Sequence, residues 1–113
     1  MKLRHSARSP FVRKVMVLAN EHRLVDRIEL VPTSLSPVQG NVTLALENPL
    51  MKVPSLVTDD GQVLFDSPVI CEYLDDMASG RKLLPAAGPA RWAVLRQQAL
   101  GDGILDAIVL CAY

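Results

Sequence analysis

The spacing of apolar residues changes several times along the chain, and each change marks an expected element. Residues 1–5 are long enough for one short strand. From 9 to about 20 the apolar positions recur at helical spacing, at Val12, Val15, Met16 and Ala19. This helix begins at Ser9-Pro10, a preferred cap followed by a proline that suits the first helical position. Residues 26–31 alternate polar and apolar side chains, which predicts a second strand.

The middle of the chain predicts a hairpin preceded by a short helix. A stretch rich in Pro, Ser and Thr at 32–40 has the composition of a loop, and a short helix is expected at about 42–47. Apolar runs at 53–57 and 63–65 flank Asp59-Asp60-Gly61. Asp-Gly between two such runs is a strong hairpin signal, so these runs are expected to pair as antiparallel strands.

Two helices separated by a linker are expected in the last part of the chain. Ser67-Pro68 begins a helix over about 68–77. Residues 79–90 contain two prolines and two glycines, the composition of a linker, and 91–111 then predict one long helix. One face of this helix carries apolar residues, at Leu100, Ile104, Ala107, Ile108 and Cys111. We expect this face to belong to a truncated all-α second domain, of which 91–113 is the first helix.

The expected order of elements is β-α-β-α-β-β-α, then a linker and a helix. A split βαβ unit followed by ββα is typical of thioredoxin-like folds, in the α/β (α+β) class. The domain organisation predicted from the sequence is therefore a thioredoxin-like domain over 1–78, a linker over 79–90 and a helix over 91–113.

Composition excludes several classes of function. Half of the residues are apolar, which excludes intrinsic disorder, and 12 basic residues balance 12 acidic ones. The absence of net charge and an aromatic content of 4% argue against nucleic acid as a partner. Neither a signal region nor an apolar run near the roughly 18 residues of a membrane span is present, so no membrane partner is expected.

The two cysteines, Cys71 and Cys111, form neither a Cys-x-x-Cys pair nor a disulfide framework. A reducing, cytoplasmic compartment is therefore expected, with Cys71 in the core. No metal-ligand spacing is found, and no Ser/His/Asp arrangement suggests a hydrolase.

Three motifs occur in a definite order: Ser9-Pro10-Phe11-Val12-Arg13-Lys14-Val15, Asn48-Pro49-Leu50-Met51-Lys52-Val53-Pro54, and Asp66-Ser67 followed by Val69-Ile70-Cys71-Glu72-Tyr73-Leu74. Together they resemble the N-terminal domain of cytosolic glutathione S-transferases, especially the bacterial members. The resemblance covers 1–78 closely. It implies a detoxifying transferase that binds glutathione as co-substrate, without a tightly bound cofactor, and activates its thiol for attack on a small electrophile.

The first motif implies the catalytic residue. The aligned loop of thioredoxins carries Cys-x-x-Cys, whereas this chain has Ser9-Pro10-Phe11-Val12, which excludes dithiol chemistry there. The resemblance implies that Ser9, or alternatively Ser6, hydrogen-bonds the glutathione sulfur. Lowering a thiol pKa by about 2 units needs about 2.7 kcal/mol. A helix terminus supplies typically about 0.3–1 kcal/mol and a hydrogen bond to a charged group about 1.5–3 kcal/mol, so the hydroxyl carries most of the shift. The structural alternative is that Ser9 is only an N-cap.

The second motif implies a binding site for the cysteinyl and glycyl parts of glutathione. The resemblance implies a cis peptide bond at Val53-Pro54, with the Val53 backbone pairing with the cysteinyl part. Lys52 would meet the glycyl carboxylate; the alternative is a solvated lysine before a strand. The chain has Met51 where the family usually has glycine, and a bulky side chain disfavours positive φ.

The third motif implies recognition of the γ-glutamyl end. Ser67 suits its carboxylate and Asp66 its ammonium, although both residues are also ordinary at a helix start. Asp102 resembles an aspartate that reaches the γ-glutamyl group of the neighbouring subunit in a homodimer; the alternative is an exposed helical aspartate.

Arg13-Lys14 is interpreted as a solvated helix face, and Trp92 is expected to pack between the domains.

Two other functions remain open on the same fold. One is a non-catalytic binding or regulatory protein, similar to the stringent starvation proteins that bind RNA polymerase. The other is a glutathione-dependent reductase or lyase. Ser9, Val53 and Asp66-Ser67 are all present in the motifs that resemble the family, and this favours glutathione binding.

Overall fold

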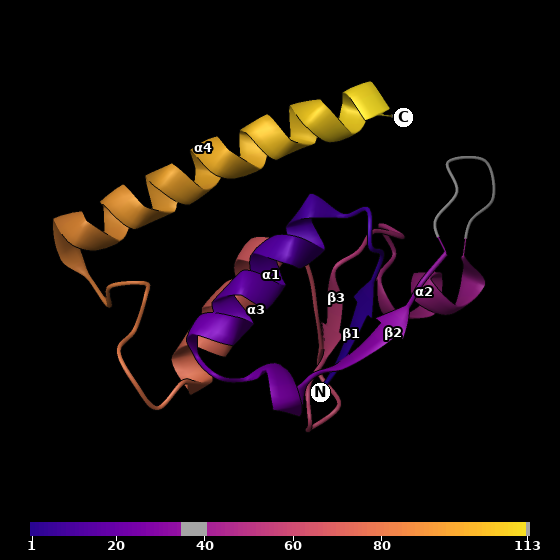
Figure 1. Ribbon diagram of the computed structural model, residues 1–113, viewed down its shortest axis with the longest axis horizontal. Helices are drawn as coiled ribbons and strands as arrows, with labels where there is room; N and C mark the ends of the chain where they lie inside the picture. Colours follow the sequence, from indigo (N-terminus) through magenta and orange to yellow (C-terminus); the bar gives the residue numbers. More distant parts are fainter. Residues whose placement is uncertain (35–40, 113) are drawn as a thin grey trace.

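A single mixed sheet forms the centre of the fold in the computed structural model, which describes residues 1–34 and 41–112. The strand order is β2-β1-β3-β4, and Figure 1 shows β2, β1 and β3 next to one another. β1 (Lys2–His5) pairs in parallel with β2 (Glu29–Pro32) and antiparallel with β3 (Ser55–Val57), which pairs antiparallel with β4 (Val63–Leu64). The thioredoxin-like βαβ-ββα order predicted from the sequence is confirmed.

Two helices, α1 (Pro10–Glu21) and α3 (Ser67–Met77), pack against each other beside the sheet (Figure 1). Most of the apolar positions that predicted the two helices are buried, at Val12, Val15 and Ala19 of α1 and Ile70 and Leu74 of α3, together with the central positions of β1 and β3, whereas Val69 is exposed. The fully buried side chains of this core include Leu3, Val15, Leu44, Leu56, Ile70 and Leu74. Leu44 belongs to the short helix α2 (Val42–Glu47), whose Glu47 accepts two hydrogen bonds from the Arg4 guanidinium at 2.7 and 3.1 Å.

The strand predicted over 26–31 is wrong in its first half. A 3-10 turn, η1 (Val25–Arg27), precedes β2, because the N–H groups of Arg27 and Ile28 donate to carbonyl groups three residues earlier. Leu24 and Ile28 are both buried at a four-residue spacing, which suits a turn rather than a strand. The last part of the predicted 32–40 loop, residues 35–40, lies outside the described residues.

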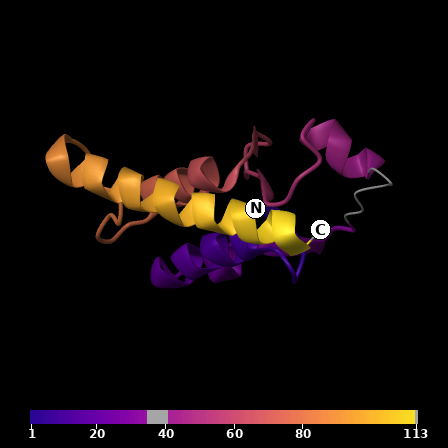
Figure 2. The ribbon, with the colours of Figure 1, turned by 90° about the horizontal axis from the view of Figure 1, so that it is seen from above.

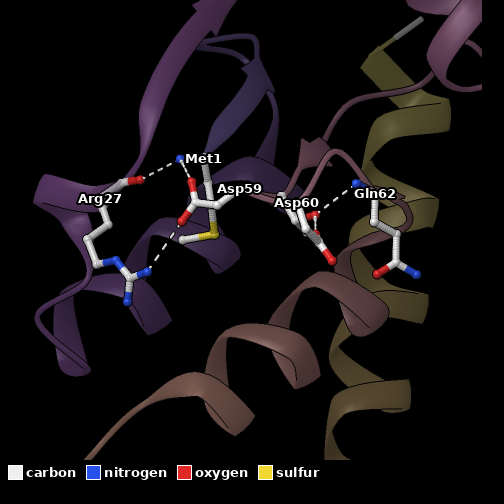
Figure 3. A network of polar contacts seen from close by, with 6 residues as sticks. Met1, Arg27, Asp59, Asp60 and Gln62 are labelled. Carbon is white, nitrogen blue, oxygen red and sulfur yellow. Dashed lines mark hydrogen bonds and ion pairs between the residues drawn. The ribbon is translucent and has the colours of Figure 1, made fainter.

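The predicted hairpin is confirmed, and its turn binds the N-terminal ammonium group of Met1. Gly61 occupies the left-handed region at φ +86°, and the Thr58 N–H donates to the Gln62 carbonyl at 2.8 Å. The ammonium of Met1 donates to Asp59 and to the Arg27 carbonyl, both at 2.9 Å, and the Arg27 guanidinium reaches Asp59 at 3.3 Å (Figure 3). The N-terminal ammonium, with help from Arg27, lowers the pKa of Asp59. These contacts join the hairpin turn to β1 and η1.

A buried carboxylate fixes the linker against the helices. Asp75, near the end of α3, accepts hydrogen bonds from the N–H groups of Leu83 and Leu84 at 2.7 and 3.1 Å, and lies 2.7 Å from His22 Nε2. Burial by itself would raise the pKa of Asp75, but the hydrogen bonds from Leu83, His22 and Leu84 lower it below the usual value. Lys82 closes the end of α3 by donating to three carbonyl groups there, those of Asp75, Asp76 and Ala78.

The last helix, α4 (Gly88–Ala112), begins three residues before the predicted start at 91 and runs above α1 and α3 (Figures 1 and 2). Its half-buried positions include 94, 98 and 102, which share the face toward α1. Trp92 lies on another face and is 66% exposed in this chain, so its packing between domains stays a prediction. None of the helices within 1–34 and 41–112 combines the length and the apolar character that a membrane span requires.

Candidate functional site

The sheet register brings the first two motifs together. Arg4 pairs with Ser55, so residues 53 and 54, which precede β3, lie next to the loop that follows β1. That loop contains Ser6 and leads to Ser9 at the start of α1. The third motif starts α3, which packs against α1. The fold therefore gathers all three motifs at the end of β1 and the N-termini of α1 and α3.

Ser9 is the N-cap of α1, and this does not exhaust its hydrogen-bonding capacity. Its Oγ accepts from the Val12 N–H at 3.2 Å. A hydroxyl that accepts this bond still has its own proton to donate, so capping and a bond to a sulfur are compatible. Ser6 Oγ accepts from the Arg8 N–H at 3.3 Å, and the Ser6 carbonyl accepts from the Ser9 N–H at 3.1 Å. Both serines thus lie in one turn, and the choice of Ser9 stays a prediction.

The Val53-Pro54 peptide bond is cis, as the resemblance implies. The Val53 side chain is buried, while its backbone lies beyond the last β1–β3 pair and outside the sheet. Lys52 is exposed, as expected for either a solvated lysine or a ligand for a carboxylate. Within residues 1–34 and 41–112, no hydrogen bond to the Val53 backbone is found, so this segment offers a strand-like edge with one cation beside it.

A buried amide that the sequence interpretation did not single out builds the loop before Val53. Asn48 is only 1% exposed; its side chain donates to the Lys52 carbonyl and accepts from the Leu50 N–H, both at 2.9 Å. The Met51 N–H donates to the Asn48 carbonyl at 2.9 Å. The signal in the sequence was Asn-Pro, a pair typical of turns. These bonds hold Met51 at φ +52°, so the loop keeps a left-handed residue without a glycine.

Replacing Met51 by glycine is expected to raise the free energy of unfolding by about 1 kcal/mol. A side chain in the left-handed region costs roughly 1–2 kcal/mol, of which glycine returns part through its greater freedom in the unfolded chain. Chemical denaturation measures the difference. Leu50→Gly is the matched control: Leu50 is 60% exposed and has no positive φ, so glycine there should lower stability. Equal effects of both substitutions would contradict the prediction.

The start of α3 differs from the expected cap. Asp66 is the N-cap residue, but its side chain makes no capping hydrogen bond and is exposed. Ser67, the first helical residue, is 2% exposed, and its Oγ accepts from the Lys14 ammonium at 3.2 Å. Among the described residues, no acceptor is found for the N–H groups of Ser67 and Val69. This terminus therefore combines unused donors with a nearby carboxylate, a combination suited to an amino acid zwitterion.

The interpretation of Lys14 as a solvated residue is wrong, whereas Arg13 is exposed as expected. The Lys14 ammonium donates to both carboxylate oxygens of Asp102 at 3.0 Å as well as to Ser67. Asp102, the predicted ligand across a dimer, thus pairs with a lysine of its own chain. No local pattern could reveal this contact, since the two residues are 88 positions apart.

Cys71 belongs to the core, as predicted, and not to the reactive part of the site. Burial raises the pKa of its thiol to about 11, although Lys14 acts in the opposite direction. A cleft of about 360 Å³ lies between α1, α3, the linker and α4, lined in part by Lys14, Leu18, Cys71, Leu84 and Val94. None of the predicted glutathione-binding residues lines it, although Lys14 of the first motif and Cys71 of the third motif do, so the cleft adjoins the candidate site without containing it. Among the described residues, no cluster of His, Cys, Asp and Glu could hold a metal ion.

Comparison with known proteins identifies the relatives of this chain. The family described as "Glutathione S-transferase, N-terminal domain" matches residues 8–77. The Escherichia coli K12 "Uncharacterized GST-like protein YibF" is 40% identical over 107 residues, covering 95% of this chain and 51% of the relative. Glutathione S-transferase omega-1 of Sus scrofa is 46% identical over 39 residues, or 34% of this chain and 16% of that protein.

Solved structures similar to this chain come from the same family. A glutathione transferase family member from Pseudomonas fluorescens Pf-5, with bound glutathione, is 50% identical with a TM-score of 0.93, covering 96% of this chain and 53% of the other. A glutathione S-transferase from Methylobacillus flagellatus KT with glutathione bound is 42% identical with a TM-score of 0.83, covering 96% and 52%. The chain therefore spans about half the length of these relatives.

Proposed function

The chain belongs to the glutathione S-transferase family, and we propose from this premise that it binds glutathione where the three motifs meet and activates its thiol. The observation that carries the proposal is the start of α3. There, the buried Ser67 and two N–H groups with no acceptor in the described part of the chain lie next to Asp66, the N-cap residue whose side chain makes no capping hydrogen bond. Two relatives of similar structure hold glutathione.

The charges of the site match those of the tripeptide end by end. Ser67 and the N-terminus of α3 suit the γ-glutamyl carboxylate, and Asp66 suits its ammonium. The unused backbone of Val53, held by the cis bond to Pro54, suits the cysteinyl part in strand-like pairing. Lys52, which is exposed, suits the glycyl carboxylate. This arrangement directs the sulfur toward the start of α1.

Ser9 is the residue proposed to act on the sulfur. Replacing Ser9 by alanine is expected to raise the pKa of the bound glutathione thiol by at least about 1 unit, because a hydrogen bond to a charged group stabilises it by about 1.5–3 kcal/mol. The thiolate absorbance of bound glutathione, followed against pH, measures this shift. Affinity at low pH, where the thiol is neutral, should change little.

Ser6→Ala is the matched control for this titration, because Ser6 lies in the same turn and accepts a comparable backbone hydrogen bond. It is expected to leave the titration of the thiol unchanged. A shift in Ser6→Ala without one in Ser9→Ala would transfer the role to Ser6. No shift in either variant would remove thiol activation from the proposal and leave glutathione binding.

The activity of the whole protein is proposed on the same basis: transfer of glutathione to a small electrophile, in cytoplasmic detoxification by a homodimer. We further propose that 1–78 is the glutathione-binding domain and that α4 opens an all-α domain. An apolar face of α4 supports this, since Leu100, Ile104 and Ile108 are each more than half exposed and recur every fourth residue. Such a face suits packing against further helices or a second subunit.

A further inference from the structure

The Lys14 side chain joins three elements that are distant in sequence. It extends from α1, contacts Ser67 at the start of α3 and forms a salt bridge with Asp102 of α4. The Lys14 and Asp102 side chains are only 23% and 18% exposed. The contact therefore lies at the γ-glutamyl end of the proposed site, partly shielded from water.

The chemistry of the ammonium group fixes the direction of the hydrogen bond to Ser67. A lysine ammonium has three donors and no acceptor, so the Ser67 hydroxyl must accept from Lys14. Ser67 is 2% exposed, and its own hydroxyl proton finds no acceptor among the described residues. The first-turn N–H groups of Ser67 and Val69 are unpaired there too. The start of α3 thus presents a hydroxyl and two N–H groups that could all donate to an anionic ligand.

Asp102 neutralises the Lys14 ammonium and fixes its position, so the role of Lys14 is not simply to attract an anionic ligand. Both carboxylate oxygens lie 3.0 Å from the ammonium, so the positive charge is already balanced and its position is held. A flexible lysine without this partner could turn away from Ser67 or bind an anion itself. With the partner in place, Lys14 acts on the hydroxyl next to it.

We propose that Lys14 is a positioning residue that commits the Ser67 hydroxyl to donate to the α-carboxylate of the γ-glutamyl group. The inference rests on the proposed binding of glutathione. Lys14 occupies the accepting side of the hydroxyl, so that its proton is available only to the ligand. The γ-glutamyl subsite is thereby made selective for a ligand with a carboxylate at this point.

The test compares three ligands in calorimetric titrations of the full chain. They are glutathione, 4-aminobutanoyl-cysteinylglycine, which lacks the α-carboxylate, and glutaryl-cysteinylglycine, which lacks the α-amino group. Lys14→Met keeps the apolar stem and removes the donor. This substitution is expected to weaken the binding of glutathione and of the glutaryl peptide about tenfold, the effect of losing one hydrogen bond to a charged group. The peptide without the carboxylate should bind this variant and the unchanged chain equally.

Arg13→Met is the matched control, since it removes the same charge from the adjacent, exposed position of α1 and should alter no affinity. Lys14→Arg keeps a charged donor and should retain the preference for the carboxylate. If Lys14→Met does not fold, Lys14→Leu, which also lacks a donor, replaces it in the same comparison.

An equal loss for all three ligands would show a merely structural role and overturn the inference. Unchanged glutathione affinity in the Lys14 variant would overturn it as well, while leaving the proposed function standing. Failure of the unchanged chain to bind glutathione would instead overturn the proposed function, and this inference with it.

Discussion

Replacing Asp75 by alanine is expected to lower the free energy of unfolding by about 3 kcal/mol, the loss typical of breaking a buried, hydrogen-bonded charge. Asp75 is 4% exposed and accepts from Leu83, Leu84 and His22. Alanine leaves these donors without their acceptor, and each unsatisfied group costs about 1–3 kcal/mol, although such costs are not additive. Chemical denaturation followed by circular dichroism measures the change.

The same interaction predicts a dependence on pH. Since the hydrogen bonds lower the pKa of Asp75 in the folded state, their stabilisation is complete above the unfolded value of about 3.9. It is lost as pH falls through that value toward the folded pKa. The stability difference between the unchanged chain and Asp75→Asn should therefore shrink below about pH 4.

Asp76→Ala is the matched control for Asp75, because the neighbouring aspartate is exposed and its carboxylate has no partner among the described residues. It should change stability by no more than about 0.5 kcal/mol. If both alanine variants unfold at the same denaturant concentration, Asp75 does not fix the linker against α3.

Replacing Ser67 by alanine is expected to weaken glutathione binding by about 1.5–3 kcal/mol, roughly 10- to 150-fold. The hydroxyl is buried, accepts from Lys14 and has its proton available for a carboxylate. Alanine removes this donor and leaves the backbone N–H groups of α3 in place, so binding weakens without disappearing. Isothermal titration calorimetry gives both affinities.

Ser55→Ala is the matched control for this loss of a hydroxyl. Ser55 is completely buried in β3, next to Pro54, and its Oγ has no hydrogen-bond partner among the described residues. Removing an unpaired buried hydroxyl should leave affinity unchanged and stability equal or higher. A similar loss of affinity in both variants would indicate a general disturbance and not a contact of Ser67 with the ligand.

Local signals predicted most of the fold. Ser9-Pro10 and the helical spacing after it gave α1, and the hairpin followed from Asp59-Asp60-Gly61. The error at 26–31 arose because alternation over a few residues also fits a turn followed by a shorter strand. Only burial of Leu24 and Ile28 on the same core distinguishes the two.

Long-range contacts explain what the sequence did not predict about the site. Lys14 meets Ser67 and Asp102 only because α1, α3 and α4 come together, at separations of 53 and 88 residues. Asn48 acts through its burial, which turn propensity does not specify. Conversely, the cis bond at Val53-Pro54 could be predicted, because the family that the motifs resemble has a cis peptide bond at this position.

A titration of the isotope-labelled chain with glutathione, followed by the backbone amide resonances, tests the central claim most directly. We expect saturable shifts at Ser67, Val69 and Val53, where unpaired backbone groups meet the ligand, and at Ser9 near the sulfur. The hairpin turn at Gly61 should not respond. Shifts confined to the cleft beside Cys71, or none at any glutathione concentration, would contradict glutathione binding at the N-termini of α1 and α3.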